Sequence, residues 1–221
     1  MPPRKSYARE NCASASAIDM SRVFATGAFK TVYAGVYTRG QREGERCVSK
    51  LFRSGSVFSE DYFASEMKVV VKAMDIVDRF NEKNFIDRRI WVNQPQIWTF
   101  VPGSTHAGEK CLVEPMIDNF EKFNSNSGWS PAQRTAWSDC MQALSHYSYH
   151  ANDRRAMLCD LQGAVFKDGF IITDPHWIVP NDVRAYFAVK KGSSMVQHLP
   201  TRQSRAPLTH FTQIEEEKED Y

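Results

Sequence analysis

The clearest periodic pattern lies between Ser59 and about Lys83, where apolar residues recur every three or four positions. The residues on this repeating face are Phe63, Met67, Val70, Met74, Val77 and Phe80. Such spacing places them on one side of an α-helix. Ser59 can cap the helix, and Glu60 and Asp61 suit the positive end of its dipole. We therefore predict one long helix here.

Strand-like segments flank this helix. Residues 31–37 alternate in the period of a strand and are rich in aromatic residues, and a polar turn separates them from a further strand at 47–52. After the helix, Pro95 interrupts residues 89–100, which predicts two short strands or a sheet edge. Residues 111–117 read as another strand. The first half of the chain is therefore predicted to be rich in strands.

The second half is mixed. Ser130, Pro131 and Gln133 have the order of a helix cap, a first helical residue and a capping-box partner, so a second helix is predicted to begin there. Residues 156–160 and 169–173 are short apolar stretches that are predicted to pair as a hairpin. The expected fold class is α+β in two lobes. A strand-rich N-lobe runs to about residue 112, a mixed C-lobe starts at about 113, and the active site is expected in the cleft.

Composition limits the remaining possibilities. The 221 residues are 42% hydrophobic with a net charge of +2, which suits one globular domain and gives no footprint for specific nucleic-acid binding. No apolar run is long enough for a membrane span. The five cysteines form no Cys-x-x-Cys pair, which favours an intracellular, cytoplasmic protein. Residues 1–18 and 190–221 are expected to be polar tails around a domain at 19–189.

Gly27 and Lys50 are candidates for binding phosphate. Gly27 lies between two strands beside the small Ala28, where backbone N–H groups can approach phosphate oxygens. A glycine between strands is also the usual sign of a hairpin turn. Lys50 lies within the strand that follows and could reach the phosphates of ATP, or it could simply face solvent. Both alternatives remain open at this point.

Carboxylates and an amide accompany the two apolar stretches of the second half. Asp160 and Gln162 follow the first stretch, and Thr173 and Asp174 end the second. Phosphoryl transfer needs one carboxylate to position or deprotonate the attacking hydroxyl, and oxygen ligands to hold Mg²⁺. Aspartate is also common in turns, so either residue alone could be a turn residue. Glu114, after an apolar strand and before Pro115, could contact an adenine and ribose.

Taken together, these segments resemble the α-kinase family of atypical protein kinases. The motifs are Phe24-Ala-Thr-Gly-Ala-Phe-Lys30, Lys50, Leu112-Val-Glu-Pro115, Phe120-Glu-Lys-Phe-Asn-Ser-Asn-Ser-Gly-Trp129, Ala143-Leu-Ser-His-Tyr-Ser-Tyr149, Asp160-Leu-Gln-Gly163 and Thr173-Asp-Pro175. The resemblance covers about Phe24 to Val179. It implies a kinase-like fold and ATP-dependent phosphorylation of serine or threonine in a protein.

The resemblance also implies roles for individual residues. ATP-binding roles fall to Gly27, Ala28, Lys30, Lys50, Glu114 and Thr173. Asp160 and Asp174 are expected to be catalytic with Lys50, and Gln162 and Asp174 to hold Mg²⁺. Lys122, Asn124 and Asn126 are expected to line the active-site rim. By analogy with conventional kinases, Glu66 is expected to pair with Lys50.

The chain departs from the family pattern after Pro175. The stretch Asn181 to Ser194 has one glycine where the family has a glycine loop, and no cysteine follows Cys159. His146 matches the family's first zinc histidine, but the cysteine pair that would complete tetrahedral zinc is missing, so no structural zinc is expected. A protein without catalytic activity that binds nucleotide or serves as a scaffold is therefore the alternative function. A third alternative is that the motif matches are accidental.

Overall fold

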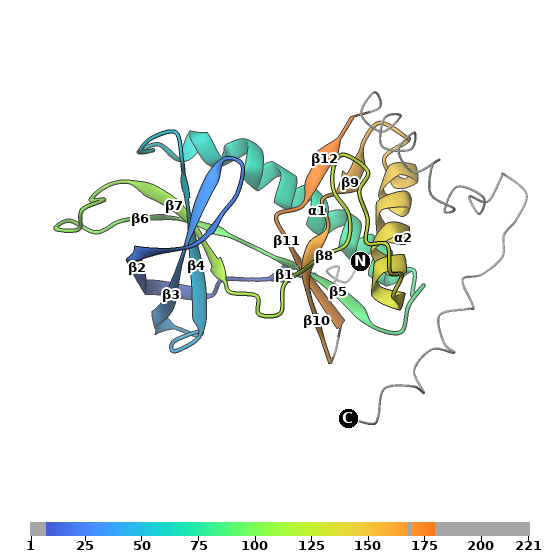
Figure 1. Ribbon diagram of the computed structural model, residues 1–221, viewed down its shortest axis with the longest axis horizontal. Coiled ribbons are helices and arrows are strands. Elements are labelled where there is room, and N and C mark those ends of the chain that lie inside the picture. Colours follow the sequence, from blue (N-terminus) through green and yellow to red (C-terminus); the bar gives the residue numbers. More distant parts are fainter. Residues whose placement is uncertain (1–7, 168, 180–221) are drawn as a thin grey trace, which may run out of the picture. The chain divides into compact units, whose positions relative to one another are not determined.

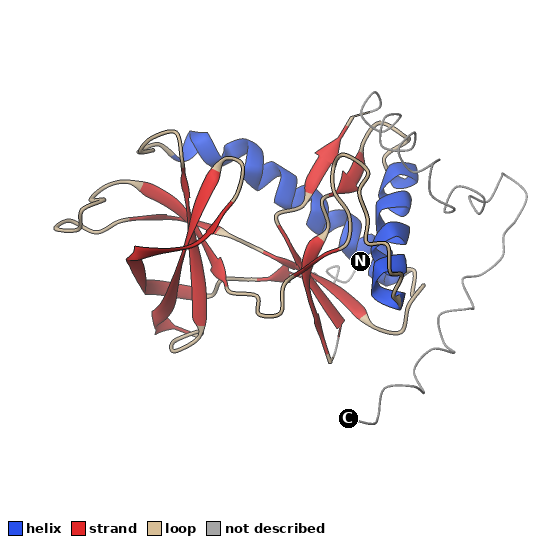
Figure 2. Ribbon diagram, viewed as in Figure 1, coloured by secondary structure: helices blue, strands red, loops and turns tan. Residues whose placement is uncertain are grey.

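The computed structural model describes residues 8–167 and 169–179, which divide into two compact units. The N-terminal unit contains residues 8–72 and 92–118, and the C-terminal unit contains the described residues of 73–91 and 119–179. Residues 113–118, expected in the C-lobe, thus group with the N-terminal unit. The expected C-terminal tail at 190–221 lies outside the described residues. Figure 2 shows strands and helices in both units.

The N-terminal unit is built on a five-stranded antiparallel sheet. Its strands, in spatial order, are β2 (Ala13–Thr26), β3 (Lys30–Gly40), β4 (Arg46–Phe52), β7 (Lys110–Pro115) and β6 (Gln96–Thr99) (Figure 1). Because side chains alternate between the faces of a strand, the sheet has two different sides. Tyr37, Cys47 and Val113 belong to one buried cluster, and Leu112 belongs to another with Phe63.

Residues 8–18 are not the loose segment expected from their composition. β1 (Ala8–Arg9) pairs in parallel with the end of β5 (Arg89–Asn93), and β2 begins at Ala13. The serine and alanine side chains of β2 are too small to produce a visible hydrophobic alternation. The strand is specified instead by its ladder with β3. The two short strands expected around Pro95 are confirmed as β5 and β6.

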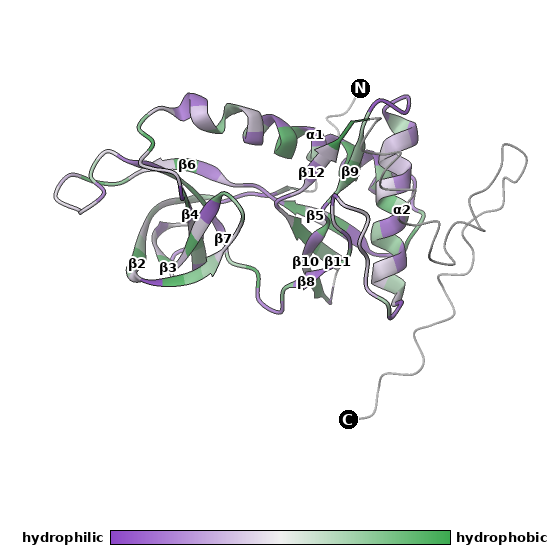
Figure 3. Cartoon of the chain, turned by 45° about the horizontal axis from the view of Figure 1, so that its top comes forward, coloured by the Kyte–Doolittle hydropathy of each residue, from purple (hydrophilic) through white to green (hydrophobic). Residues whose placement is uncertain are grey.

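The long helix is confirmed. A 3₁₀ turn, η1 (Glu60–Phe63), is capped by the Ser59 side chain, which accepts a hydrogen bond from the Asp61 amide, and leads into α1 (Ala64–Glu82). Hydrophilic and hydrophobic positions alternate along α1 in Figure 3. Phe63, Val70, Val77 and Phe80, all on the predicted face, are buried. Within the described residues, no helix is sufficiently long and apolar to cross a membrane.

The second helix begins later than predicted. α2 (Ala136–Ala151) is capped by Thr135, whose side chain accepts a hydrogen bond from the Ser138 amide. Thr135 is itself a good cap, so Ser130 and Pro131 remain in the preceding turn. The inner face of α2 buries Cys140, Met141 and Leu144.

The predicted hairpin of 156–160 with 169–173 is wrong. β11 (Gly169–Thr173) pairs with β10 (Gln162–Phe166), in a sheet with the order β5, β11, β10 and β8 (Glu121–Lys122). β9 (Met157–Cys159) pairs separately with β12 (His176–Ile178). The apolar run at 156–160 therefore ends where the backbone turns from one ladder into the next. Sequence pattern alone does not reveal which of two successive short strands is the partner.

Gly163 and Gly103 provide a matched test of this pairing. Both have positive φ, at 155° and 90°, but a Cβ at Gly163 would lie 1.8 Å from the Ile171 carbonyl oxygen, whereas one at Gly103 meets nothing within 4 Å. We expect Gly163→Ala to lower the free energy of unfolding by about 3 kcal/mol or more. Gly103→Ala should cost about 1 kcal/mol. Denaturant titrations of both variants measure this, and equal costs would contradict the β10–β11 register.

Candidate functional site

The predicted site residues fall into two sets, one in each unit. The N-terminal unit contains Gly27, Ala28, Lys30, Lys50 and Glu114. The C-terminal unit contains Lys122, Asn124, Asn126, Asp160, Gln162, Thr173 and Asp174. This division separates most of the residues predicted to contact the base and phosphates, Thr173 excepted, from most of those predicted to carry out the chemistry.

Lys50 is not a solvent-facing lysine. In the β4–β7 ladder Lys50 lies opposite Leu112, and Val48 lies opposite Glu114, so all four residues share one face of the sheet. The Lys50 ammonium lies 2.6 Å from the Glu114 carboxylate, and the two side chains are only 7% and 3% exposed. Two opposite charges this deeply buried must be paired, because leaving one alone would cost several kcal/mol.

Glu66 pairs with Lys30 and not, as predicted, with Lys50. The register explains the difference. Lys30 lies opposite Phe52, on the same face as Lys50 but two residues farther along β4, and its ammonium also lies 5.3 Å from the centre of the Phe52 ring. Phe52 packs with the residues that begin the helix, so Lys30 is the cation that meets Glu66. The N-terminal unit thus holds two lysines on one face, each matched to a carboxylate.

The Gly27 segment is a tight turn between β2 and β3. The Gly27 amide donates to the Lys30 carbonyl at 2.8 Å, which is the hairpin geometry of the simpler interpretation. Arg53 donates to the carbonyl of Gly27 at 3.2 Å and lies 3.5 Å from that of Ala28. Sequence reasoning missed Arg53, because it belongs to no motif and reaches the turn only through folding. It adds a cation to the segment predicted to meet phosphate.

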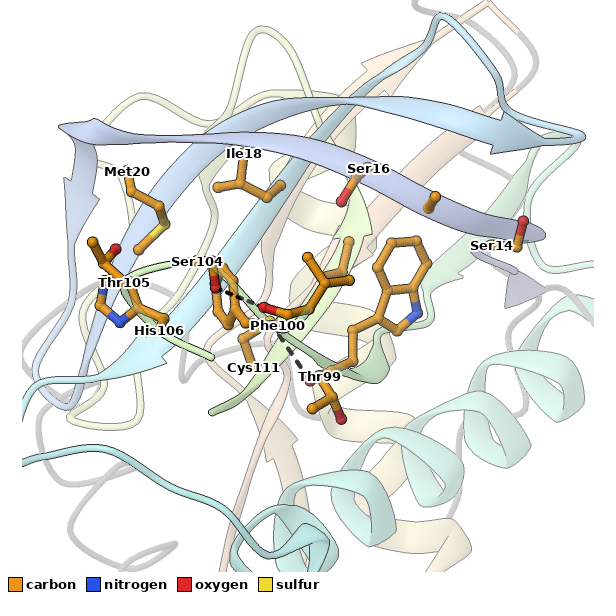
Figure 4. Close-up of a pocket in the computed structure, with 14 residues that line it drawn as sticks. Ser14, Ser16, Ile18, Met20, Thr99, Phe100, Ser104, Thr105, His106 and Cys111 are labelled. Carbon is orange, nitrogen blue, oxygen red and sulfur yellow. Dashed lines mark hydrogen bonds between the residues drawn. The ribbon is translucent and has the colours of Figure 1, made fainter. Parts of the chain in front are cut away.

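A cavity of about 300 Å³ lies on the opposite face of the same sheet (Figure 4). Its walls include Ser16 and Met20 of β2, Phe100, and Cys111 and Val113 of β7. Leu112 and Glu114, which alternate with these last two residues, face the other way. No lysine, arginine, aspartate or glutamate lines this cavity, so it lacks the groups that bind a triphosphate. The predicted nucleotide residues therefore do not belong to it.

Asp160 and Asp174 occupy matching kinks in the C-terminal unit. Asp160 links β9 to β10 and Asp174 links β11 to β12, each with positive φ, at 58° and 47°. The pairs Cys159–His176 and Gln162–Thr173 bracket both kinks. The two kinks must therefore lie beside each other between the two ladders. Aspartate tolerates this left-handed conformation better than most residues. The structure thus places the backbone of the two aspartates that the sequence singled out at neighbouring kinks.

Lys122 neutralises Asp160. Lys122 is paired with Gln162 between β8 and β10, and its ammonium lies 2.7 Å from the Asp160 carboxylate. Both side chains are partly exposed, at 41% and 24%. A cation in this position holds the carboxylate in place while leaving it accessible. Lys122 is therefore a partner of the predicted catalytic aspartate as well as a surface residue.

Asn124 differs from its expected place at the rim, since it is completely buried. Its side-chain oxygen accepts from the Leu161 amide at 2.9 Å, and its amide group donates to the Ser145 hydroxyl at 3.0 Å. It therefore connects the residue after Asp160 to helix α2. Asn126 is exposed, as a rim residue should be. Gln162 is half-buried, Thr173 is buried and Asp174 is exposed.

His146 does not meet cysteine in the described part of the chain. Its Nε2 atom lies 3.2 Å from Nε2 of His150, one helical turn away. Burial raises the pKa of Cys140 and of Cys159 to about 12, so neither thiol is prepared to ionise. Among residues 8–167 and 169–179, no three His, Cys, Asp or Glu side chains gather as a metal site. The absence of structural zinc therefore stays a prediction, which rests on the missing cysteine pair in the sequence.

Two comparisons of sequence find α-kinases. The model of the α-kinase family matches residues 25–189. The α-protein kinase vwkA of Dictyostelium discoideum is 36% identical over 64 residues, which make up 28% of this chain. The match spans only 10% of that relative's length.

Solved structures show the same fold. The α-kinase domain of myosin heavy chain kinase A with AMP has a TM-score of 0.63 and 20% identity, covering 78% of this chain and 85% of that one. The inactive domain of the same kinase with ATP has a TM-score of 0.64 and 19% identity, covering 85% of this chain and 90% of that one. The α-kinase domain of myosin-II heavy chain kinase A with adenosine has a TM-score of 0.61 and 20% identity, covering 78% of this chain and 80% of that one. The predicted α+β, kinase-like fold is confirmed by this likeness.

Asn124 and Asn126 provide a test of the support beneath Asp160. Replacing Asn124 with alanine leaves the Leu161 amide buried without its acceptor, so we expect the free energy of unfolding to fall by about 2–3 kcal/mol. Asn126→Ala, at an exposed position of the same segment, should change it by less than about 0.5 kcal/mol. Urea denaturation measures both, and a negligible effect of Asn124→Ala would remove its assigned role.

His146 should make the folded protein sensitive to acid. Burial, and secondarily the neighbouring His150, lower the pKa of His146 below its ordinary value. The unfolded chain therefore binds the proton more readily, and stability is lost as pH falls through the unfolded pKa of about 6.5. Between pH 7.5 and 5.5, the wild type should lose more stability than His146→Gln. His176→Gln, at an exposed position of β12, is the control and should follow the wild type.

Proposed function

Because the chain belongs to the α-kinase family, we propose that it is an ATP-dependent protein kinase that phosphorylates serine or threonine hydroxyls. The observation that supports this proposal best is the pair of kinks that carry Asp160 and Asp174. Metal-assisted phosphoryl transfer requires carboxylates held near each other, and neighbouring kinks at strand ends can present them. Family membership and fold support a protein kinase, and the rest of the proposal depends on individual side chains.

The N-terminal unit supplies the groups for nucleotide binding. We assign Lys50 to the phosphates, because its ammonium is a cation that Glu114 holds in a fixed place on the face of the sheet shared with Lys30. Glu114 takes the adenine end of the nucleotide. Lys30 adds a cation and Ala28 a backbone amide of the turn for the phosphates, with Arg53 beside them. The relatives solved with AMP, ATP and adenosine make such a ligand plausible for this fold.

The C-terminal unit supplies the groups for transfer. Asp160 holds the substrate hydroxyl and accepts its proton as the oxygen bonds to the γ-phosphorus and ADP departs. Lys122 keeps Asp160 in position and adds positive charge near the transferred group. Gln162 and Asp174 carry the oxygen donors that Mg²⁺ prefers, and Thr173 lies opposite Gln162 in the ladder. Bound Mg²⁺ would neutralise charge on the phosphates.

The alternative function is nucleotide binding without transfer. Its support is the stretch Asn181 to Ser194, which has one glycine where the family has a glycine loop. This stretch lies beyond the described residues, so the comparison is one of sequence. Both functions predict that ATP stabilises the protein, by about 1.4 kcal/mol when the ligand is tenfold above its Kd. Only the kinase predicts turnover.

The test is Mg²⁺-dependent transfer of labelled phosphate from ATP to a basic protein substrate. We expect Asp160→Asn and Asp174→Ala each to lower kcat by about 100-fold or more, because a proton acceptor or a metal ligand is lost. Asp153→Ala is the matched control, since Asp153 is an exposed aspartate in the same unit with a positive φ of 51°. Its rate should stay within about twofold of the wild type.

Each outcome distinguishes the two functions. Thermal stabilisation by ATP without measurable transfer would establish the binding protein and reject the kinase. Full transfer by Asp174→Ala would reject the assignment of Asp174. If ATP neither stabilises the protein nor serves as a phosphate donor, both functions are rejected and the motif matches have no role.

A further inference from the structure

The chain before the family match is fixed against the N-terminal sheet. The match starts at residue 25, whereas β1 already pairs Ala8 and Arg9 with Val92 and Asn93. Backbone bonds secure this segment on two sides. The Gln94 amide donates to the Arg9 carbonyl at 3.0 Å, and the Arg42 side chain donates to the Glu10 carbonyl at 2.8 Å. Residues 8–10 are therefore an integral, hydrogen-bonded part of the N-terminal unit.

Three side chains of this region donate to the backbone on either side of Glu114. Asn11 donates to the Val113 carbonyl at 3.0 Å, Asn93 to the Pro115 carbonyl at 2.9 Å and Arg9 to the Met116 carbonyl at 3.3 Å. Asn11 and Asn93 are 0% and 1% exposed. We call Arg9, Asn11 and Asn93 the clasp.

The clasp replaces a missing strand. β6 pairs with β7 only as far as Gln96 opposite Val113, so the carbonyls beyond this point have no further ladder partner on that side. Pro115 has no N–H to donate to any neighbour. Buried carbonyls need donors, and the clasp side chains provide them. On the other side of β7, the ladder with β4 continues to Cys47 opposite Pro115, and the Met116 amide donates to the Arg46 carbonyl at 3.0 Å. The clasp thus supports the backbone from Glu114 to Met116 on the side that β6 leaves open.

We infer that Arg9, Asn11 and Asn93 are positioning residues for nucleotide binding, which set the place of Glu114 at the adenine end. This inference rests on the proposed function, since it assigns Glu114 to the base. Arg9 also lies within electrostatic reach of Glu114, and burial lowers the pKa of its guanidinium. A clasp residue contacts no phosphate and no reacting atom in this assignment. Its loss should therefore weaken binding of the base without changing the chemical step.

The experiment compares Asn11→Ala and Asn93→Ala with the wild-type chain. Isothermal titration gives the Kd for adenosine and for ATP, and transfer assays give kcat. We expect both Kd values to rise by the same factor, about tenfold, because the lost contact concerns the base that the two ligands share. The kcat at saturating ATP should stay within about twofold of the wild type.

Asn81→Ala is the matched control for a merely structural effect. Asn81 is 1% exposed and donates to the Ile90 carbonyl at 2.8 Å, but it belongs to the C-terminal unit, and the bonds of its side chain go to Ile90 and not to the backbone around Glu114. It should lose stability as the clasp variants do, with an unchanged Kd for adenosine. Arg9→Met tests the clasp at a half-buried position should a buried asparagine variant fail to fold.

The outcomes separate the clasp from the proposed function. Wild-type adenosine affinity in folded Asn11→Ala, Asn93→Ala or Arg9→Met would overturn the clasp and leave the kinase intact. A Kd that rises for ATP but not for adenosine would also overturn it, because the defect would then lie at the phosphates. Absence of ATP binding by the wild type itself would overturn the proposed function and the clasp together.

Discussion

The buried ion pair between Lys50 and Glu114 is the constraint around which the N-terminal unit is organised. Their charges lie 2.6 Å apart with almost no exposure to water. Taking two such ions from water costs several kcal/mol each, and only good geometry compensates. That geometry requires the β4–β7 register, which places both residues on one face. It also requires a fixed end to β7, which lies next to Glu114. The β4–β7 ladder and the clasp therefore both help to hold the Lys50–Glu114 ion pair in place.

In the C-terminal unit, backbone geometry rather than a buried ion pair determines where the two candidate aspartates lie. Asp160 and Asp174 are brought together because two ladders, β9–β12 and β10–β11, share the same two chain segments. Each segment must change ladder, and each does so at an aspartate with positive φ. The Asn124 side chain then accepts a hydrogen bond from the amide of Leu161, the residue after Asp160. The carboxylates are thus positioned by structure that is formed before any ligand is present.

Sequence patterns predicted the elements better than their partners. The helix of 59–83, the two short strands around Pro95 and the α+β class follow from periodicity and turn chemistry, which are local. The hairpin partner of β11 and the partner of Glu66 do not, because register depends on contacts across the fold. Small side chains concealed β2, since Ala13 to Ala17 bury too little surface to show a pattern. The sequence singled out Asp160 and Asp174 as candidates, but it paired their strands wrongly and gave no sign of the kinks at which the two residues lie.

The pairing of Lys50 with Glu114 also bears on how a nucleotide could bind. A phosphate oxygen that binds Lys50, as proposed, could either join the pair or displace Glu114 from it. Displacement would be costly, because breaking a buried pair by removing one partner typically costs about 3–5 kcal/mol. Addition is therefore favoured over exchange, and Glu114 would remain beside Lys50 when the phosphates arrive. A carboxylate that stays in place needs a rigid backbone. The clasp, of which Arg9 and Asn11 precede the family-matched region, supplies that rigidity, which makes the first strand part of the same arrangement.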